Sequence, residues 1–346
     1  MNADAAAIEQ QRADYYRRIS SKHLTPLWEV LHSIVPRQPA PKCVPVLWRY
    51  QEVRGPLMEA GELISAEEAI RRVLILENPA FRGESRVTNT LYAGLQLLKP
   101  AEVAPAHRHT QSALRFVLEG TGAFTSVEGE RHFMSMGDLV LTPAWTWHDH
   151  GSEGHEPTIW LDGLDIPLVQ MLDAGFAENM PAQQQVVTRP AGDAMARYGA
   201  NLLPVDYQGA SLTSPVFAYP YQRTREALRA MSRGGKPHPN HGYKMRYINP
   251  TTGGYALPTM AAFMQLLPAS FISKPYRSTD ATVFVVVEGS GRSTVSGTSY
   301  QWGSRDIFVV PSWHRCQHEA FDDAVLFSFS DRVVQERLGL WREVPE

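Results

Sequence analysis

From Thr90 onward the chain alternates between apolar and polar positions, a pattern typical of half-buried strands. Leu91, Ala93, Leu95 and Leu97 fall on one side of the first such strand. Further short segments of this kind follow, separated by glycine-containing turns, at residues 112–119, 123–127, 133–136, 139–141 and 158–164. Short strands joined by tight turns predict a small antiparallel barrel.

The chain before Thr90 has a different pattern. Residues 3–18 are polar and rich in alanine, which favours a helix on the surface. Ser65 followed by Glu68 is a helix-start signal, and the apolar spacing after it predicts a second helix that ends at Asn78, before a proline. The proline-rich segment 36–56 predicts an extended, irregular connection.

An internal repeat indicates that the barrel is duplicated. Glu119-Gly-Thr-Gly122 recurs as Glu288-Gly-Ser-Gly291, and Asp138-Leu-Val-Leu-Thr-Pro-Ala-Trp145 recurs as Asp306-Ile-Phe-Val-Val-Pro-Ser-Trp313, at nearly the same offset. Two matches in the same order argue for two related barrels. We therefore predict four regions, namely 1–89 (helical and extended), 90–167 (first barrel), 168–250 (a structured linker with a helix at 224–231) and 251–346 (second barrel and C-terminal tail).

Composition and charge exclude several classes of protein. The chain has 346 residues, of which 43% are hydrophobic and 20% charged, as in ordinary globular proteins. The net charge of −3 leaves no basic excess for nucleic acid, and no segment predicts a signal peptide or a membrane span. The two cysteines can form neither a disulfide framework nor a thiolate zinc site, which fits a reducing compartment such as the cytoplasm.

Three histidines form a candidate metal site. His107 and His109 are two residues apart, so on a strand their side chains project to the same side. His148 follows the predicted strand 139–141, which would return it to the same end of the barrel. A histidine pair alone is more often a surface or core feature, but the third histidine favours metal binding. Three neutral imidazoles suit Fe, Zn, Cu or Ni.

The motifs around these histidines resemble a known family. Pro105-Ala-His-Arg-His109 and Gly137-Asp-x4-Pro143-x4-His148 resemble the two cupin motifs, and together with Trp160-Leu-Asp-Gly-Leu-Asp165 they resemble the gentisate 1,2-dioxygenase family. The resemblance implies a mainly β bicupin fold, with two double-stranded β-helix (jelly-roll) barrels and N-terminal and linker helices. It also implies Fe(II) and an extradiol-type cleavage of gentisate (2,5-dihydroxybenzoate) by O2 between C1 and C2, giving maleylpyruvate.

The motifs leave two alternatives open. Salicylate and 1-hydroxy-2-naphthoate 1,2-dioxygenases share most of them, and a non-enzymatic bicupin that binds a metal or an aromatic acid is an alternative of another class. The resemblance further implies a homo-oligomer, usually a tetramer, whose partners are a small aromatic acid and O2.

The ligand set departs from many cupins, which place a glutamate shortly after the histidine pair. Residues 110–116 contain no carboxylate, so we expect three histidines and no protein anion at the metal. In the second barrel the repeat places Tyr276 and Ser278 opposite His107 and His109, and Cys316 or Gln317 opposite His148. We therefore expect no metal there.

Further residues are candidates for catalysis and substrate binding. Arg115 would pair with the substrate carboxylate or, alternatively, lie on the wet face of the barrel. His150 would shuttle a proton or donate a hydrogen bond to the substrate, and Asp162 would orient a histidine or belong to a surface turn. The remaining candidates for substrate contact are Gln96, whose direction the strand pattern leaves uncertain, Tyr92 and Trp147, which otherwise pack in the fold, and Arg71, which is otherwise a solvated helical arginine.

Overall fold

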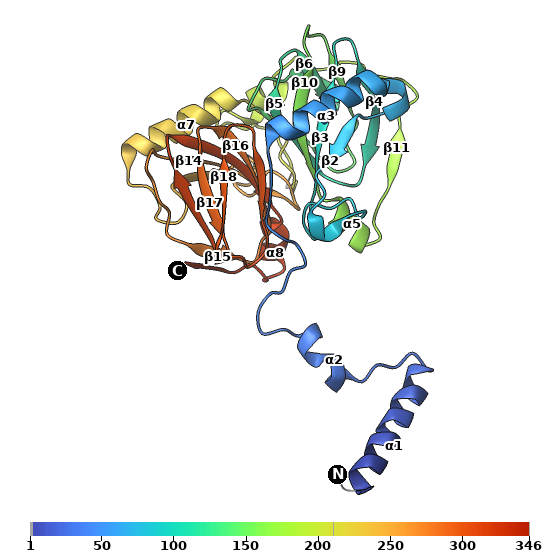
Figure 1. Cartoon of the computed structure of the whole chain (residues 1–346). Coiled ribbons are helices and arrows are strands. Elements are labelled where there is room, and N and C mark those ends of the chain that lie inside the picture. The colour runs from blue at the N-terminus through green and yellow to red at the C-terminus, as the bar shows by residue number, and fades with distance from the viewer. Residues whose placement is uncertain (1–2, 210, 346) are drawn as a thin grey trace. The chain divides into compact units, whose positions relative to one another are not determined.

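Figure 1 shows the computed structural model, which describes residues 3–209 and 211–345. The chain forms two compact units, residues 1–40 and residues 41–346. Both barrels belong to the second unit.

The N-terminal unit contains two helices, α1 (Ala3–Ser20) and α2 (Leu27–Ile34). The Tyr16 hydroxyl joins them, because it donates to Glu29 (2.6 Å) and accepts from the indole of Trp28 (3.0 Å). The helix predicted at residues 3–18 is confirmed and extends to Ser20.

The first barrel is built from two antiparallel sheets, drawn in cyan to green in Figure 1. The six-stranded sheet has the order β12-β8-β5-β10-β3-β2 and the five-stranded sheet the order β11-β4-β9-β6-β7. The strands of the first sheet are β2 (Val73–Ile75), β3 (Tyr92–Leu98), β5 (Ala113–Glu119), β8 (Leu139–Thr142), β10 (Thr158–Leu164) and β12 (Ala218–Tyr219). Those of the second are β4 (Val103–His109), β6 (Ala123–Val127), β7 (Glu130–Phe133), β9 (His148–Ser152) and β11 (Ala177–Asn179).

The second barrel repeats this arrangement. Its sheets have the orders β1-β19-β16-β21-β14-β13 and β18-β17-β20-β15-β22. The strands of the first are β1 (Val46–Trp48), β13 (Tyr243–Arg246), β14 (Ala261–Leu267), β16 (Thr282–Glu288), β19 (Ile307–Val310) and β21 (Ala324–Ser330). Those of the second are β15 (Tyr276–Ser278), β17 (Gly291–Val295), β18 (Thr298–Trp302), β20 (Cys316–Ala320) and β22 (Glu343–Pro345).

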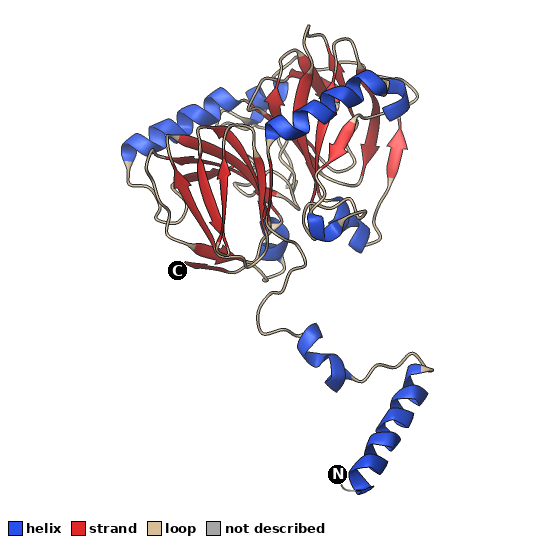
Figure 2. Ribbon diagram, in the orientation of Figure 1, coloured by secondary structure: helices blue, strands red, loops and turns tan. Residues whose placement is uncertain are grey.

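The register of the strands confirms the duplication. In the first barrel His107 pairs with His148, and in the second Tyr276 pairs with Cys316. The predicted mainly β, two-barrel fold with N-terminal and linker helices is therefore confirmed, as the ribbon in Figure 2 shows.

The two barrels share one hydrophobic core. The rings of Phe116 and Phe327 stack with centroids 4.1 Å apart, so strands β5 and β21 of the two barrels are in direct contact. A Cβ atom on Gly163 would approach the ring of Phe329 to 2.8 Å, which leaves room for glycine alone at this contact. The outer face of the first barrel's larger sheet is therefore buried against the second barrel.

The extended connection predicted at residues 36–56 is wrong in its second half. Helix α3 (Tyr50–Leu63) begins there, and its first backbone N–H, that of Tyr50, donates to the Asp306 carboxylate (2.9 Å). Asp306 also pairs with Arg49 (2.9 Å). A partner 256 residues away in sequence stabilises this helix start, and so the local pattern did not predict it.

The helix predicted from Ser65 to Asn78 is wrong after its first turn. The Ser65 hydroxyl accepts from the Glu68 N–H (3.1 Å), which confirms the helix start, but α4 spans only Ala66–Ala69. Ile70 has φ 58° and ψ −48°, a positive-φ conformation outside the helical region that ends the helix. Residues after Arg72 then extend as β2 and pair with β3.

The strand predicted at residues 133–136 is also misplaced. Strand β7 begins at Glu130, because Glu128 and Gly129 form a tight turn with positive φ values (47° and 79°) and the returning strand pairs at once with β6. The helix predicted at residues 224–231 is confirmed as part of α7. The remaining helices are the 3-10 helix η1 (Pro79–Phe81), α5 (Ile166–Met171), α6 (Asp193–Tyr198), α7 (Tyr221–Gly234) and α8 (Arg332–Arg337).

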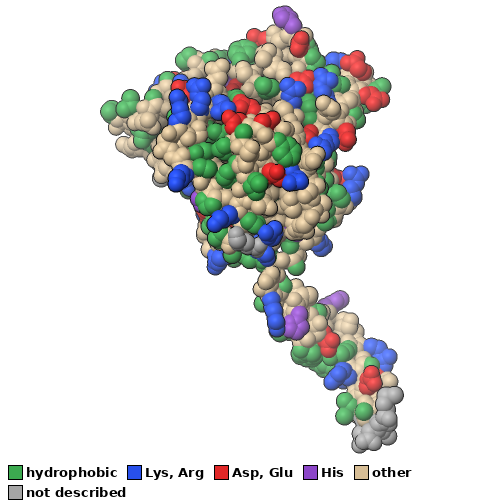
Figure 3. Space-filling model, turned by 60° about the vertical axis from the view of Figure 1, so that its left-hand side comes forward, with side chains coloured by type: hydrophobic (Ala, Val, Ile, Leu, Met, Phe, Trp, Pro, Cys, Tyr) green, Lys and Arg blue, Asp and Glu red, His purple; other side chains and the backbone are tan. Residues whose placement is uncertain are grey.

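Acidic and basic side chains are interspersed over the face shown in Figure 3, in keeping with the small net charge. Among the described helices none has the length and apolar character that crossing a membrane requires. Cys43 and Cys316 are both buried and unpaired with each other.

Candidate metal centre

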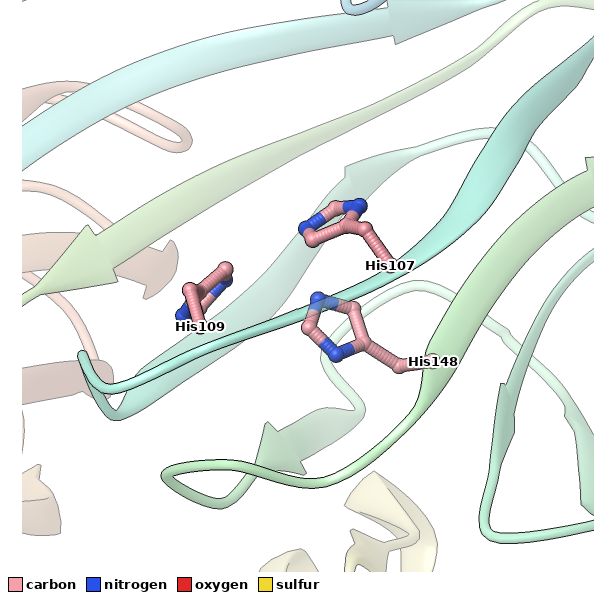
Figure 4. A group of neighbouring side chains, drawn as sticks. All are labelled: His107, His109 and His148. Carbon is pink, nitrogen blue, oxygen red and sulfur yellow. The ribbon is translucent and has the colours of Figure 1, made fainter. Parts of the chain in front are cut away.

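Strands β4 and β9 bring three imidazoles together inside the first barrel (Figure 4). One ring nitrogen from each of His107, His109 and His148 lies within 4.8 Å of the others. Within residues 3–209 and 211–345 no carboxylate or thiol joins this group. The predicted set of three histidines without a protein anion is therefore what the fold assembles.

Main-chain carbonyls orient the three rings. Nδ1 of His109 lies 2.8 Å from the carbonyl oxygen of Gln111, and Nδ1 of His148 lies 2.9 Å from that of Thr146. Nδ1 of His107 faces the carbonyl of Pro105 (3.3 Å). An N–H at Nδ1 of His109 and of His148 leaves the lone pair of each ring on Nε2, which is the arrangement a metal-binding histidine needs.

Burial keeps these rings neutral. It lowers the pKa of His107 to about 3 and that of His109 to about 4, and it holds the pKa of His148 well below its usual value. Nε2 of His148 is fully buried and has no hydrogen-bond partner among the described residues. A buried lone pair without a partner is costly, and a metal ion would satisfy it. The donor set thus fits a metal ion that accepts imidazole ligands.

The lowered pKa values predict a pH dependence of stability. A histidine with a folded-state pKa of about 4 and an ordinary unfolded-state value near 6.5 stabilises the fold above pH 6.5, and this contribution is lost as the pH falls toward 4. We expect the free energy of unfolding of the metal-free chain to fall over this range by up to about 1.4 kcal/mol per pH unit for His109 alone. Urea unfolding of the wild-type chain and of His109→Gln measures this slope. An equal slope in both would contradict the assignment.

Arg115 lies beside the histidines rather than on the wet face. It projects from β5 into the barrel, where its Nε lies 3.3 Å from Asp162 and its Nη1 donates to the Thr142 hydroxyl (2.8 Å). Burial lowers the pKa of Arg115, and burial raises the pKa of Asp162 to about 6 against the opposing effect of that arginine. Within the described residues Asp162 contacts Arg115 and the indole N–H of Trp160 (3.0 Å), and not a histidine.

Arg71 is not on a helix, because it follows α4 in the turn before β2. Its Nη2 donates to the carbonyl of Pro105 (2.8 Å) and lies against Nδ1 of His107. Burial and the nearby Arg115 lower the pKa of Arg71 to about 10. Two guanidinium groups therefore border the metal centre.

Gln96 and Tyr92 lie on the inner face of β3. Gln96 is paired with Trp160 and Gly94 with Asp162, and paired residues project from the same side of a sheet. Leu95 and Leu97 project from the other face, where a Cβ atom on Gly61 of α3 would lie 2.8 Å from Leu97. The strand pattern left the direction of Gln96 uncertain because both faces of β3 are buried.

His150 lies next to the ligands, and Trp147 does not. The ring centroids of His150 and His148 are 5.9 Å apart, and burial and Arg115 hold the pKa of His150 well below its usual value. The ring of Trp147 instead stacks on the guanidinium of Arg108 (4.7 Å). Arg108 alternates with the ligands along β4 and pairs with Glu178 at the surface, so Trp147 lies outside the barrel.

Sequence reasoning missed two residues that hold the site together. Thr142 accepts a hydrogen bond from Arg115, and Trp160 donates one to Asp162. Alternation along β10 was the available signal for Trp160, which shares a barrel face with Asp162, whereas only the register of the strands brings Thr142 to Arg115.

Comparisons with known proteins agree with this site. Residues 94–164 match the family model described as Cupin domain. The chain is 55% identical to gentisate 1,2 dioxygenase 1 of Aquipseudomonas alcaligenes over 97% of both chains. It is 39% identical to a gentisate 1,2-dioxygenase of a Streptomyces species, over 95% of this chain and 94% of the relative.

Among solved structures, the chain is similar to salicylate 1,2-dioxygenase from Pseudoaminobacter salicylatoxidans in its adduct with gentisate. The two superpose with a TM-score of 0.92 at 35% identity, covering 97% of this chain and 94% of the other. The similarity extends over both barrels, so it is not confined to the metal-binding motif.

Proposed function

The chain belongs to the gentisate 1,2-dioxygenase family, and from this premise we propose that it is an Fe(II)-dependent oxidoreductase that cleaves the ring of gentisate. O2 is inserted between C1 and C2, the carbons that carry the carboxylate and the neighbouring hydroxyl, and the product is maleylpyruvate. The observation that carries the proposal is the group of three neutral imidazoles with Arg115 buried beside it.

His107, His109 and His148 would each hold the metal through one ring nitrogen. When bound, Fe(II) supplies open coordination positions and the electron transfer that O2 needs in order to react with an aromatic ring. Because the protein contributes no anion among the described ligands, the full positive charge of the ion remains available to an anionic substrate. This favours a chelating aromatic acid.

The residues around the ligands would bind and orient that acid. Arg115 and Arg71 place two positive charges beside the histidines, against the single carboxylate of Asp162. We assign the substrate carboxylate to Arg115, because Asp162 and Thr142 immobilise this buried guanidinium beside the ligands.

Tyr92, Gln96 and His150 complete the inner wall. Tyr92 and Gln96 share the inner face of β3 with Gly94, where a Cβ atom would lie 2.8 Å from the Tyr92 hydroxyl, so the glycine makes room for that side chain. His150 would hydrogen-bond the substrate or take part in moving its proton. Asp162 acts through Arg115 and is therefore a positioning residue, and Trp147 has no part in the site.

Oxygen uptake tests this function. Iron-loaded protein with gentisate should consume one O2 per ring cleaved and form a product that absorbs near-ultraviolet light. Salicylate should support much slower uptake, because it lacks the electron-donating second hydroxyl. The same fold accommodates gentisate in a salicylate dioxygenase, so salicylate 1,2-dioxygenase is the second candidate function. Faster uptake with salicylate would favour it, and uptake with neither acid would favour a non-enzymatic binding protein.

We also propose that the chain works as a homo-oligomer in the cytoplasm. Helix α2 supports the first point, because none of its residues is buried although Leu27, Trp28, Leu31 and Ile34 are apolar. Sedimentation of the wild-type chain measures the assembly directly.

A further inference from the structure

Each barrel contains a buried histidine that faces a hydroxyl at the same distance. In the first barrel Nδ1 of His150 lies 2.8 Å from Oγ1 of Thr125, its partner across strands β9 and β6. In the second barrel Nδ1 of His318 lies 2.8 Å from Oγ of Ser293, its partner across β20 and β17. All four residues are completely buried.

The third member of each group differs. The Thr125 hydroxyl lies 3.3 Å from Sδ of Met134 and donates to it, because a thioether sulfur can only accept. At the equivalent place in the second barrel the indole N–H of Trp302 donates to Ser293 Oγ (2.9 Å). An indole N–H can only donate. The two hydroxyls therefore have neighbours of opposite hydrogen-bonding character.

This difference favours a different hydrogen position on each ring. With its one hydrogen directed at Met134, the Thr125 oxygen accepts from His150, which then carries its hydrogen on Nδ1. Ser293 already accepts from Trp302, so its own hydrogen is free for Nδ1 of His318, which leaves the hydrogen of that ring on Nε2. Nε2 of His318 faces Sγ of Cys316 (3.6 Å), which is a weak acceptor for such an N–H.

We propose that Thr125 and Met134 are positioning residues that fix His150 in the Nδ1–H form, so that its Nε2 presents a lone pair to the substrate. Nε2 of His150 is buried without a hydrogen-bond partner among the described residues. The group that meets His150 is then a hydrogen-bond donor, such as a phenolic hydroxyl, and not a carboxylate.

Neutron diffraction of deuterium-exchanged crystals of the metal-loaded protein tests the assignment directly. We expect deuterium on Nδ1 of His150 and none on Nε2, with the deuterium of Thr125 directed at Met134. In the second barrel we expect deuterium on Nε2 of His318. Deuterium on Nε2 of His150 would overturn the proposal. This measurement does not depend on the proposed function, whereas the kinetic test below rests on it.

Variants test the consequence for turnover. Thr125→Val removes the hydroxyl at nearly constant volume, and we expect kcat/KM for gentisate to fall about tenfold or more with metal content unchanged. Thr125→Ser keeps the hydroxyl and should restore the value to within about threefold of wild type. Unchanged kcat/KM in Thr125→Val would reject the positioning role.

Two further variants distinguish the positioning role from a purely structural effect. Ser293→Ala removes the matching hydroxyl in the second barrel and should lower the midpoint of thermal unfolding while leaving kcat/KM unchanged. Met134→Leu conserves the core volume but removes the sulfur, so the Thr125 hydrogen can turn to Nδ1, and neutron diffraction should then find deuterium on Nε2 of His150. If wild-type protein turned over no hydroxybenzoate, the proposed function would fail while the neutron result still decided the tautomer.

Discussion

His148→Ala should abolish metal binding and ring cleavage together. The wild-type chain should hold about one metal ion, since the described residues contain a single group able to bind one. His148 supplies the most deeply buried of the three ligands, and its removal leaves two imidazoles on one strand with an open side. Loss of the metal removes several kcal/mol of transition-state stabilisation, so we expect activity to fall by about 10³-fold or more.

Cys316→Ala is the matched control for this experiment. Cys316 occupies the position in the second barrel that corresponds to His148, as its pairing with Tyr276 shows. The variant should retain about one metal ion per chain and nearly full activity. Metal analysis by mass spectrometry and oxygen uptake measure both quantities. Metal retained by His148→Ala would exclude His148 as a ligand.

Most of the fold was predictable because it rests on local patterns. Strands β3, β5, β6, β8 and β10 followed from their local pattern, and the repeated turn motifs placed the second barrel, whereas β4 and β9 were not predicted as strands. The errors lie where distant contacts override local preference. Helix α3 begins at the Asp306 carboxylate of the second barrel, and α4 ends because Ile70 adopts a positive φ that a β-branched residue rarely takes.

The metal ligands were predictable for a similar reason. His107 and His109 obey the two-residue period of a strand, and His148 follows the predicted strand 139–141, which returns it to the same end of the barrel. The surroundings were harder to predict. Gln96 belongs to a strand buried on both faces, so alternation could not tell inside from outside. Trp147 was a different case, because it directly precedes a ligand, and neighbouring residues of an extended segment project to opposite sides.

The contacts that immobilise the site were the least predictable part. Thr125 meets His150 across 25 residues of sequence, and Thr142 meets Arg115 across 27. Neither pair has a sequence motif, and only the register of the strands brings them together. The same register aligns the second barrel, in which other residues replace the three histidines. There the pair of Thr125 and His150 persists as Ser293 and His318.

Arg115→Gln should weaken substrate binding and leave the metal in place. The guanidinium is buried beside Asp162, so its loss removes a charge-assisted contact to the substrate carboxylate and leaves Asp162 without its ion-pair partner. We expect kcat/KM for gentisate to fall by about a hundredfold, corresponding to about 3 kcal/mol. Most of this should appear in KM, because a carboxylate is bound equally in the ground state and the transition state.

Arg108→Gln distinguishes this effect from a general loss of positive charge. Arg108 lies on the same strand as two of the ligands but on the outer face, stacked on Trp145 and Trp147 and paired with Glu178. Its replacement should change KM less than about threefold, since a surface ion pair is worth about 1 kcal/mol or less. Steady-state kinetics and metal analysis of both variants decide the matter. Equal increases in KM would mean that long-range attraction, and not a direct contact with Arg115, recruits the acid to the barrel.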